Sequence, residues 1–582
     1  MDKEVYEFIS KKSNDPIIEW RTCRVSGKQF AIYESDKEFY EKMGPLFGWK
    51  KYLIPFPTLC PEERARRRMA WKNDHHYFRR NCDISWEPIT SIFHPSTLWP
   101  VYKVKYRRGD GWSALDYGRN VDLNTSFLKQ YQSLYDVVPK IAMVNDDGFG
   151  SENCEYCQNI AYSKDCYLNT VSWKLRDCYY SSNMGTGERI IDSFFTMDSS
   201  LCYECIEGYG LYECFYLWSC GYCRTCFFGY ELHGCQDCAF CVGLQNQQYC
   251  LFNEQLDKDS YKQKIQKIRL EFASNPLPWY QQREDFLQQF PRKAMNLVQS
   301  EESVGNNLVN AHKTICCYNL KNPKECKYRM FGDTGVEGVD LTVGGELELC
   351  YEWIVPDHSH QAWFTIFCWK CDDIWYSEMC HGCHHCFGCV WLKNKEYCLL
   401  NKQYSKQEYE ELVPHIIWRM QQDHEWGEFF PISMSPFAYN HTIAQDYFPS
   451  NFSSVQEYGA KWLEEKREFN IPEGMKVVDA TSLPRNPQEV DDKILDQAIR
   501  CETSSRPFRM MPKELEFYRK YLIPLPRQHP LERYRARLKR MPEKTLYLRK
   551  CDKTWEKILS VYPAWVPFKV YSEESYRQEV YG

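Results

Sequence analysis

The chain has 582 residues, which is enough for several domains with buried cores. Its hydrophobic fraction of 43% and charged fraction of 26% are those of an ordinary globular protein, and its net charge of −6 argues against a protein that coats nucleic acid with its whole surface. No run of about 18 apolar residues occurs and residues 1–20 are polar, so the sequence predicts neither a membrane-spanning helix nor a signal peptide. We therefore expect a cytoplasmic protein whose 30 cysteines stay reduced.

The two ends of the chain share a sequence pattern. Lys-Tyr-Leu-Ile-Pro at 51–55 recurs 469 residues later at 520–524, and Trp86 recurs at the same offset as Trp555. The match predicts two related end modules that bracket the rest of the chain.

Between them, cysteine recurs every twelve residues in two stretches. The first register holds Cys154, Cys166, Cys178, Cys202, Cys214, Cys226, Cys238 and Cys250. The second holds Cys326, Cys350, Cys386 and Cys398, and a shift of 148 residues carries the first stretch onto the second without a gap. A fixed short period predicts stacked repeats, which we name array 1 (151–250) and array 2 (302–398).

Residues typical of strands, broken by short polar turns, dominate both arrays. Twelve residues give a perimeter of about 40 Å, enough for two or three very short strands and their corners. We therefore predict narrow β-solenoids with laddered cysteines, and a chain of successive β-hairpins is the alternative. Apolar residues at helical spacing in 257–273, 279–298 and 405–423 predict helices that cap the arrays.

The predicted fold class is mainly β with helical caps, an α+β protein. In chain order, the predicted segments are the amino-terminal module (1–110), a connector (111–150), array 1 (151–250), a helical cap (251–301), array 2 (302–398), a helical cap with an aromatic connector (399–480) and the carboxyl-terminal module (481–582).

Paired C-x2-C spacings in both arrays are the candidate metal site. Two such pairs can present four thiolates to one zinc ion. The alternative is that these thiols are small hydrophobic side chains of a buried core. The candidate ligands are Cys220, Cys223, Cys235 and Cys238 in array 1, and Cys368, Cys371, Cys383 and Cys386 in array 2.

Basic runs in both end modules are the candidate nucleic-acid site, because aromatic residues are interleaved with the charges and could stack on bases. The alternative is a solvated basic helix that pairs with neighbouring glutamates. The candidate residues are Arg66, Arg67, Arg68, Lys72, Arg79 and Arg80 at one end, and Arg533, Arg535, Arg537, Lys539 and Arg540 at the other.

Three short motifs carry a resemblance to a known family: Leu-Cys-Pro at 59–61, Ser-Lys-Asp-Cys-Tyr at 163–167 and Gly-Glu-Phe-Phe-Pro at 427–431. Through these and the overall layout, the chain resembles a cysteine-rich repeat family of candidate phyla radiation (Patescibacteria) bacteria with zinc-ribbon-like terminal modules. The resemblance covers nearly the whole chain. It implies this layout and implies no activity.

In the zinc-ribbon-like modules of that family, pairs of cysteines supply the zinc ligands. Here the second member of each pair is replaced, as in Cys23 with Ser26, Cys60 with Glu63, and Cys501 with Ser504. Because hydroxyl groups do not replace thiolates as zinc ligands, we expect degenerate modules without metal.

The sequence holds no GxxxxGK[ST], GxGxxG, GxSxG or HExxH motif, so we expect no enzyme. The favoured function is a non-enzymatic interaction scaffold that binds a macromolecular partner through its repeat surfaces and end modules. The alternatives are an RNA- or DNA-binding protein and a zinc- or redox-active thiol protein. We expect a protein or nucleic-acid partner, no membrane, no small-molecule substrate, and no cofactor unless zinc binds in the arrays.

Overall fold

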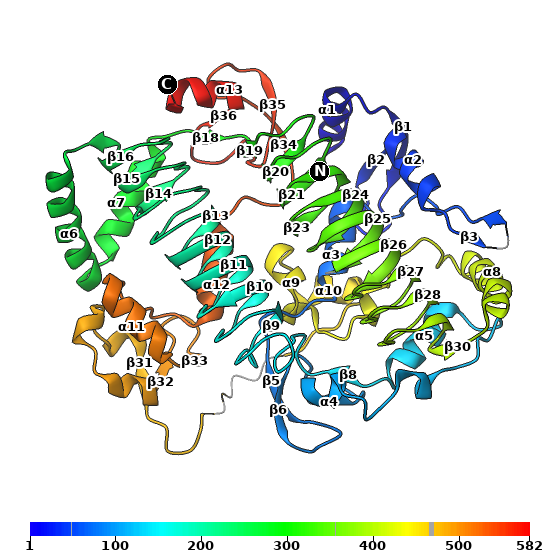
Figure 1. Cartoon of the computed structure of the whole chain (residues 1–582). Coiled ribbons are helices and arrows are strands. Elements are labelled where there is room, and N and C mark those ends of the chain that lie inside the picture. Colours follow the sequence, from blue (N-terminus) through cyan, green and yellow to red (C-terminus); the bar gives the residue numbers. More distant parts are fainter. Residues whose placement is uncertain (48, 355–356, 465–468, 470, 582) are drawn as a thin grey trace. The chain divides into compact units, whose positions relative to one another are not determined.

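The computed structural model describes residues 1–47, 49–354, 357–464, 469 and 471–581, without the side chains of 345–350 and 357–361. The protein is mixed α and β, with more residues in strands than in helices (Figure 1). In the described part, no helix has the length and apolar composition needed to cross a membrane.

The chain divides into two compact units. Unit 1 comprises Met1–Ala142, Ala294–Leu463 and Glu543–Val566, and unit 2 comprises Met143–Lys293, Glu464–Pro542 and Pro567–Gly582. Array 2 therefore belongs to the same unit as the amino-terminal module, and array 1 to the same unit as most of the carboxyl-terminal module. The latter, predicted at 481–582, is divided between the units.

Array 1 consists of short parallel strands in unit 2. They are β9 (Gln158–Ala161), β10 (Thr170–Arg176), β11 (Ser182–Ile191), β12 (Phe194–Tyr203), β13 (Ile206–Tyr209), β14 (Phe227–Tyr230), β15 (Gln236–Val242) and β16 (Gln248–Leu251). Neighbours pair twelve residues apart, as Thr170 does with Ser182. Isolated bridges at the same spacing, such as Tyr203 with Phe215, connect β12 to the later strands. The antiparallel β17 (Glu254–Gln255) follows β16.

Array 2 has the same parallel pairing in unit 1. Its strands are β19 (Leu297–Val298), β20 (Val304–Val309), β21 (Ile315–Lys321), β22 (Pro323–Lys327), β23 (Met330–Gly332), β24 (Gly335–Thr342), β25 (Gly345–Ile354), β26 (Asp357–Ile366), β27 (Asp372–Trp375), β28 (His384–Phe387), β29 (Glu396–Leu399) and the antiparallel β30 (Lys402–Gln403). Among its described residues, the register shifts between Val304 and Gly305. The side chain of Cys350 lies outside the described residues.

A three-residue rule governs the backbone of both arrays. At Asp177, Tyr180 and Asn183 the φ angle is 53°, 54° and 56°, and such left-handed residues recur at every third position through most of each array. Each left-handed residue turns the chain, and in most repeats the residue that follows it is buried, as Cys178, Ser181 and Met184 are. One twelve-residue repeat therefore has four short sides of three residues, where the sequence predicted two or three strands.

Helices lie next to the strands of both arrays. The predicted helices 257–273 and 405–423 are present as α6 (Lys258–Ser274) and α8 (Lys406–Gln422). The helix predicted at 279–298 is wrong beyond Gln288, where α7 (Leu277–Gln288) ends. Pro291 cannot continue a helix, and β18 (Arg292–Lys293) instead pairs in parallel with β36 (Val570–Tyr571).

The amino-terminal module and its connector consist of short helices, two-stranded antiparallel hairpins and one parallel strand pair. They are α1 (Lys3–Ser13), β1 (Ile17–Thr22), β2 (Gln29–Tyr33), α2 (Glu34–Met43), β3 (Leu46–Phe47), β4 (Lys50–Lys51), α3 (Pro61–Met69), β5 (Phe78–Asn81), β6 (Pro88–Ser91), β7 (Val101–Tyr102), α4 (Val104–Arg108), α5 (Phe127–Tyr135) and β8 (Lys140–Ile141). The parallel pair is β7 with β8. The aromatic connector after α8 continues into α9 (Ile443–Tyr447) and α10 (Phe452–Glu457).

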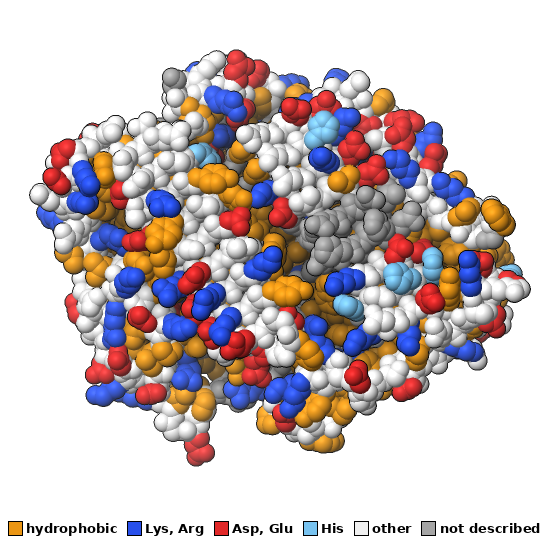
Figure 2. Space-filling view, viewed as in Figure 1, with side chains coloured by type: hydrophobic (Ala, Val, Ile, Leu, Met, Phe, Trp, Pro, Cys, Tyr) orange, Lys and Arg blue, Asp and Glu red, His pale blue; other side chains and the backbone are white. Residues whose placement is uncertain are grey.

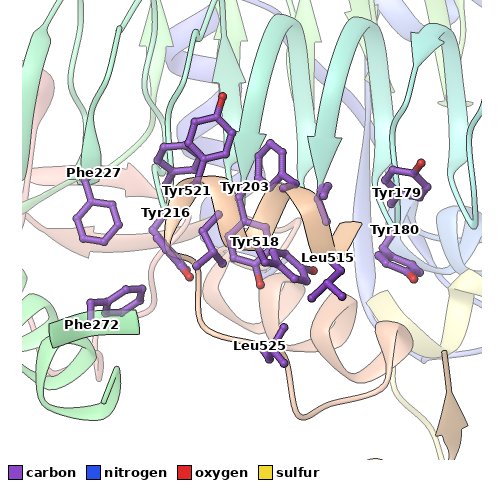
Figure 3. Packing of buried hydrophobic residues seen from close by; sticks show 14 of the residues in the cluster. Tyr179, Tyr180, Tyr203, Tyr216, Phe227, Phe272, Leu515, Tyr518, Tyr521 and Leu525 are labelled. Atoms are coloured by element: carbon purple, nitrogen blue, oxygen red, sulfur yellow. The ribbon is translucent and has the colours of Figure 1, made fainter. Parts of the chain in front are cut away.

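The carboxyl-terminal module repeats several of these elements. They are β31 (Val477–Asp479), β32 (Ala498–Arg500), β33 (Pro507–Phe508), α11 (Pro512–Tyr521), α12 (Pro530–Arg540), β34 (Tyr547–Lys550), β35 (Lys557–Ser560) and α13 (Glu573–Tyr576). Aromatic side chains of array 1 pack against α11 in a buried cluster: the Tyr203 and Tyr518 ring centroids are 5.5 Å apart (Figure 3). Burial of these rings holds this part of the module to the array.

Candidate functional site

The predicted zinc ligands all lie inside the arrays. Each of the eight thiol side chains is at most 2% exposed. Their C-x2-C spacing follows from the three-residue rule, since Cys220 and Cys223 are consecutive inward residues on adjacent sides of one repeat. The spacing that suggested a metal site therefore has a purely structural explanation.

The inward thiols donate hydrogen bonds to backbone carbonyl groups at the corners. The Cys223 Sγ donates to the carbonyl of Gly221, two residues before it, and to that of Leu232 in the next repeat, both at 3.3 Å. Serine does the same elsewhere: the Ser181 Oγ donates to the Tyr179 carbonyl at 3.0 Å and accepts the Ser193 N–H at 3.1 Å. Small side chains with one polar atom fit because the interior is narrow and buried backbone groups need partners.

Contacts between thiols perturb their ionisation. S–H donation from Cys226, Cys235 and Cys241 lowers the pKa of Cys238, whereas burial raises the pKa of Cys220. In array 2, donation from neighbouring thiols likewise lowers the pKa of Cys383. Among the described side chains, no group of three or more His, Cys, Asp and Glu is arranged to hold a metal ion. Zinc binding stays a prediction for metal analysis to decide.

The basic helix of the amino-terminal module inserts its arginines against array 2. Helix α3 contacts β24 and β25. The Arg64 Nε lies 2.7 Å and the Arg68 Nη1 3.2 Å from the carboxylate of Asp340, which is fully buried. Arg67 pairs with Glu352, one repeat further along, and with Glu428 at 2.8 Å.

The same arrangement occurs in unit 2, between α12 and array 1. The Arg537 Nη1 lies 3.0 Å from Asp192 and 2.8 Å from Glu204, and Arg533 also pairs with Asp192. Asp192 and Asp340 correspond at the 148-residue offset of the arrays, and Arg533 and Arg64 at the 469-residue offset of the modules. We call each set of buried pairs an Arg–Asp clamp.

The clamps correct the predicted nucleic-acid site. Five of its residues, Arg67, Arg68, Lys72, Arg533 and Arg537, are buried and ion-paired, so they cannot form an exposed phosphate-binding face. The other six are at least partly exposed as residues: Arg66, Arg79, Arg80, Arg535, Lys539 and Arg540. The side chain of Arg80, however, is only 8% exposed and pairs with Asp83. On the face drawn in Figure 2, Lys and Arg side chains are interspersed with Asp and Glu. Binding of nucleic acid through these six residues stays a prediction.

Array 1 has two adjacent faces whose side chains remain exposed. One carries a polar column with both charge signs, in which Lys164 pairs with Glu152 of the preceding repeat at 2.6 Å. The other carries Tyr162, 66% exposed, and Tyr222, 68% exposed, which are five repeats apart in a column that also holds Lys174, Thr186 and Asp198. We call these the polar face and the aromatic face.

The end-module cysteine positions come together in part. S–H donation from Cys60 lowers the pKa of Cys23 to about 4, and the Ser26 Oγ lies 3.7 Å from the Cys60 Sγ. In the other module, the His529 N–H donates to the Cys501 Sγ at 3.2 Å. In the amino-terminal module Cys23 and Cys60 thus lie together with the Ser26 hydroxyl beside them, and in the other module a backbone N–H lies beside Cys501.

No protein-family model, curated protein or solved structure matches the chain. The function must therefore be argued from the arrangement of its own residues.

Proposed function

We propose that the protein is a non-enzymatic scaffold in which two β-solenoid-like arrays, held by degenerate zinc-ribbon-like modules, present repeat faces to a protein partner. The observation that carries the proposal is the contrast between the sides of array 1. The side next to α11 and α12 is buried under aromatic packing and the Arg–Asp clamp, while the polar and aromatic faces remain exposed. Stacked repeats with one side fixed provide a rigid extended binding surface.

The chemistry of the exposed faces favours protein over nucleic acid. The polar face carries both charge signs, since Glu152 and Glu188 lie in the same column as Lys164 and Arg176, so it lacks the continuous positive charge that phosphates require. Exposed tyrosines supply large contact area at little cost in side-chain entropy, and tyrosine and arginine are enriched where proteins bind each other. The thiols stay out of contact with a partner because they point inward.

The test is affinity capture from the cells that produce the protein, followed by mapping of cross-links. A partner bound to the faces should cross-link to Lys164 and Lys174 and not to Lys267, which lies on the exposed side of α6. The double variant Tyr162→Asp/Tyr222→Asp should reduce the amount of that partner recovered at least tenfold, whereas Lys267→Asp should leave the recovered amount unchanged. Equal recovery with both variants, or cross-links confined to α6, would overturn the proposal.

A further inference from the structure

Four turns in the end modules share one backbone conformation. They span 23–28, 82–87, 501–506 and 551–556, and in each the cysteine N–H donates to the sixth residue while its carbonyl accepts the N–H of the fifth, at 2.8 to 3.1 Å. The fifth residue always has positive φ: 68° at Gly27, 60° at Trp86, 60° at Ser505 and 63° at Trp555. We call these the knuckle turns.

Tryptophan is an unfavourable residue for this position. A left-handed φ crowds the Cβ of any residue other than glycine. Bulky residues do adopt it in the arrays, but Tyr180, for example, is buried there and its N–H donates to the neighbouring repeat. Packing does not offset the cost, because Trp86 is 74% and Trp555 71% exposed. Glycine in the equivalent place at 27 shows that the turn itself does not require a large side chain. Strain that folding does not explain points to a function for the side chain.

Basic residues lie near both tryptophans, and a glutamate follows each of them directly in the chain. Lys550, Lys553 and Lys557 are exposed on the β34–β35 hairpin, and the Lys550 Nζ lies 5.9 Å from the centre of the Trp555 ring. Beside Trp86, Lys103 and Lys105 reach Glu87 at 3.6 and 3.3 Å. Each turn is fixed by a matched ion pair, Arg80 with Asp83 at 3.0 Å and Arg549 with Asp552 at 2.8 Å.

We propose that Trp86 and Trp555 are stacking platforms for the bases of single-stranded nucleic acid, with the neighbouring lysines on its phosphates. An exposed indole stacks on any base, and lysines beside it add sequence-independent, salt-dependent attraction. The site uses neither the buried arginines nor the faces of array 1. Failure of this proposal would therefore leave the scaffold function untouched, and the reverse is also true.

The experiment measures binding of fluorescein-labelled dT12 and U12 to the full chain by fluorescence anisotropy at 50 and 200 mM NaCl. The wild type should bind either probe, more weakly at the higher salt concentration. Trp86→Gly/Trp555→Gly should raise the Kd at least tenfold without lowering the unfolding temperature, because glycine relieves the turn while removing the ring. Trp86→Phe/Trp555→Phe should retain most of the affinity.

The pairing of these two readouts separates binding from a structural role. If the glycine variant unfolds at a lower temperature and binds as tightly as the wild type, the tryptophans are structural and the proposal is wrong. If the wild type does not bind the probes, the proposal is also wrong. It is likewise wrong if heparin and dT12 compete equally well and the glycine variant loses no affinity, because the attraction would then be purely electrostatic.

Discussion

Inward residues of the arrays must be small and must offer one polar atom to the backbone. Cys214 is fully buried, and its Sγ lies 3.4 Å from the carbonyl oxygens of Tyr212 and Cys223. Cys214→Ser should change the free energy of unfolding by less than about 1 kcal/mol, because serine already fills equivalent positions. Cys214→Asp should cost several kcal/mol by burying an unpaired charge. Urea unfolding of the two variants checks this, and equal tolerance of both would show that the position is not enclosed.

The packing of each module against its array depends on the clamp carboxylates. Asp192→Asn removes the buried ion pair of Arg533 with Asp192 and one of the two ion pairs of Arg537, which stays paired with Glu204, and this should destabilise unit 2 by about 3–5 kcal/mol. Asp340→Asn should do the same in unit 1 through Arg64 and Arg68.

Asp198→Asn is the matched control for the clamp variants, since Asp198 is also a left-handed corner residue of array 1 but is exposed. Hydrogen exchange should show faster exchange in α12 for Asp192→Asn and in α3 for Asp340→Asn, and no change for the control. Unchanged exchange in both helices would contradict the role of the clamps.

A buried glutamate makes the stability of unit 1 depend on pH. Burial raises the pKa of Glu378 from 4.5 to about 7, while nearby Lys140 lowers it and the Tyr135 hydroxyl donates to its carboxylate at 3.3 Å. Because the folded protein then holds a proton that the unfolded chain releases, the free energy of unfolding should fall as pH rises from about 5 to about 7.

The expected change from Glu378 is at most about 3 kcal/mol. Glu378→Gln, which mimics the protonated acid, should flatten the pH dependence over this range in urea titrations. The measurement stops near pH 7 because burial also lowers the pKa of Lys140 to about 7, so that lysine contributes a rise in stability above that pH. An unchanged slope in the variant would assign the effect to other groups.

At the scale of elements, the sequence predicted the spacing of the strands but not the three-residue sides. Cysteine at one position in twelve has a visible period, whereas the left-handed corners are occupied by residues as different as Asp177, Tyr180 and Lys174, so they leave no compositional pattern. The run Cys220, Cys223, Cys226 has a spacing of three and could have indicated the three-residue sides. The same spacing is also typical of zinc ligands, so it did not distinguish the two explanations. The Arg–Asp clamps escaped prediction because their partners are about 270–340 residues apart in sequence.

Neighbouring exposed residues of β11 test the three-residue rule. Thr186 is a β-branched residue at φ 45°, so Thr186→Gly should stabilise the array by up to about 1 kcal/mol. Glu188, two residues later, is exposed outside a corner, so Glu188→Gly should destabilise by a similar amount. Thermal unfolding compares the two, and destabilisation by both would mean that the corner is not strained.

At the scale of the whole molecule, the chain order of modules and arrays is not their order of packing. The amino-terminal module clamps the second array and the carboxyl-terminal helices clamp the first, within separate units. Duplication is visible in the sequence at both offsets, but it does not say which module covers which array. That choice depends on contacts between segments distant in the chain, which only the folded structure supplies.

The burial of the cysteines predicts how many thiols react in the folded protein and how much zinc it holds. None of the 29 cysteines whose side chains are described forms a disulfide, and all of them are buried. Many of the array thiols donate to backbone carbonyls, as Cys223 and Cys386 do. A thiol reagent should therefore modify few groups in the folded protein and about 30 after denaturation. Elemental mass spectrometry of protein purified without chelator should find far less than one zinc per chain, because zinc requires thiolates and would displace those hydrogen bonds. About two zinc ions per chain, with correspondingly protected thiols, would contradict this prediction and mean that the arrays need metal to fold. The ligands would then be Cys220, Cys223, Cys235, Cys238 and their array 2 counterparts.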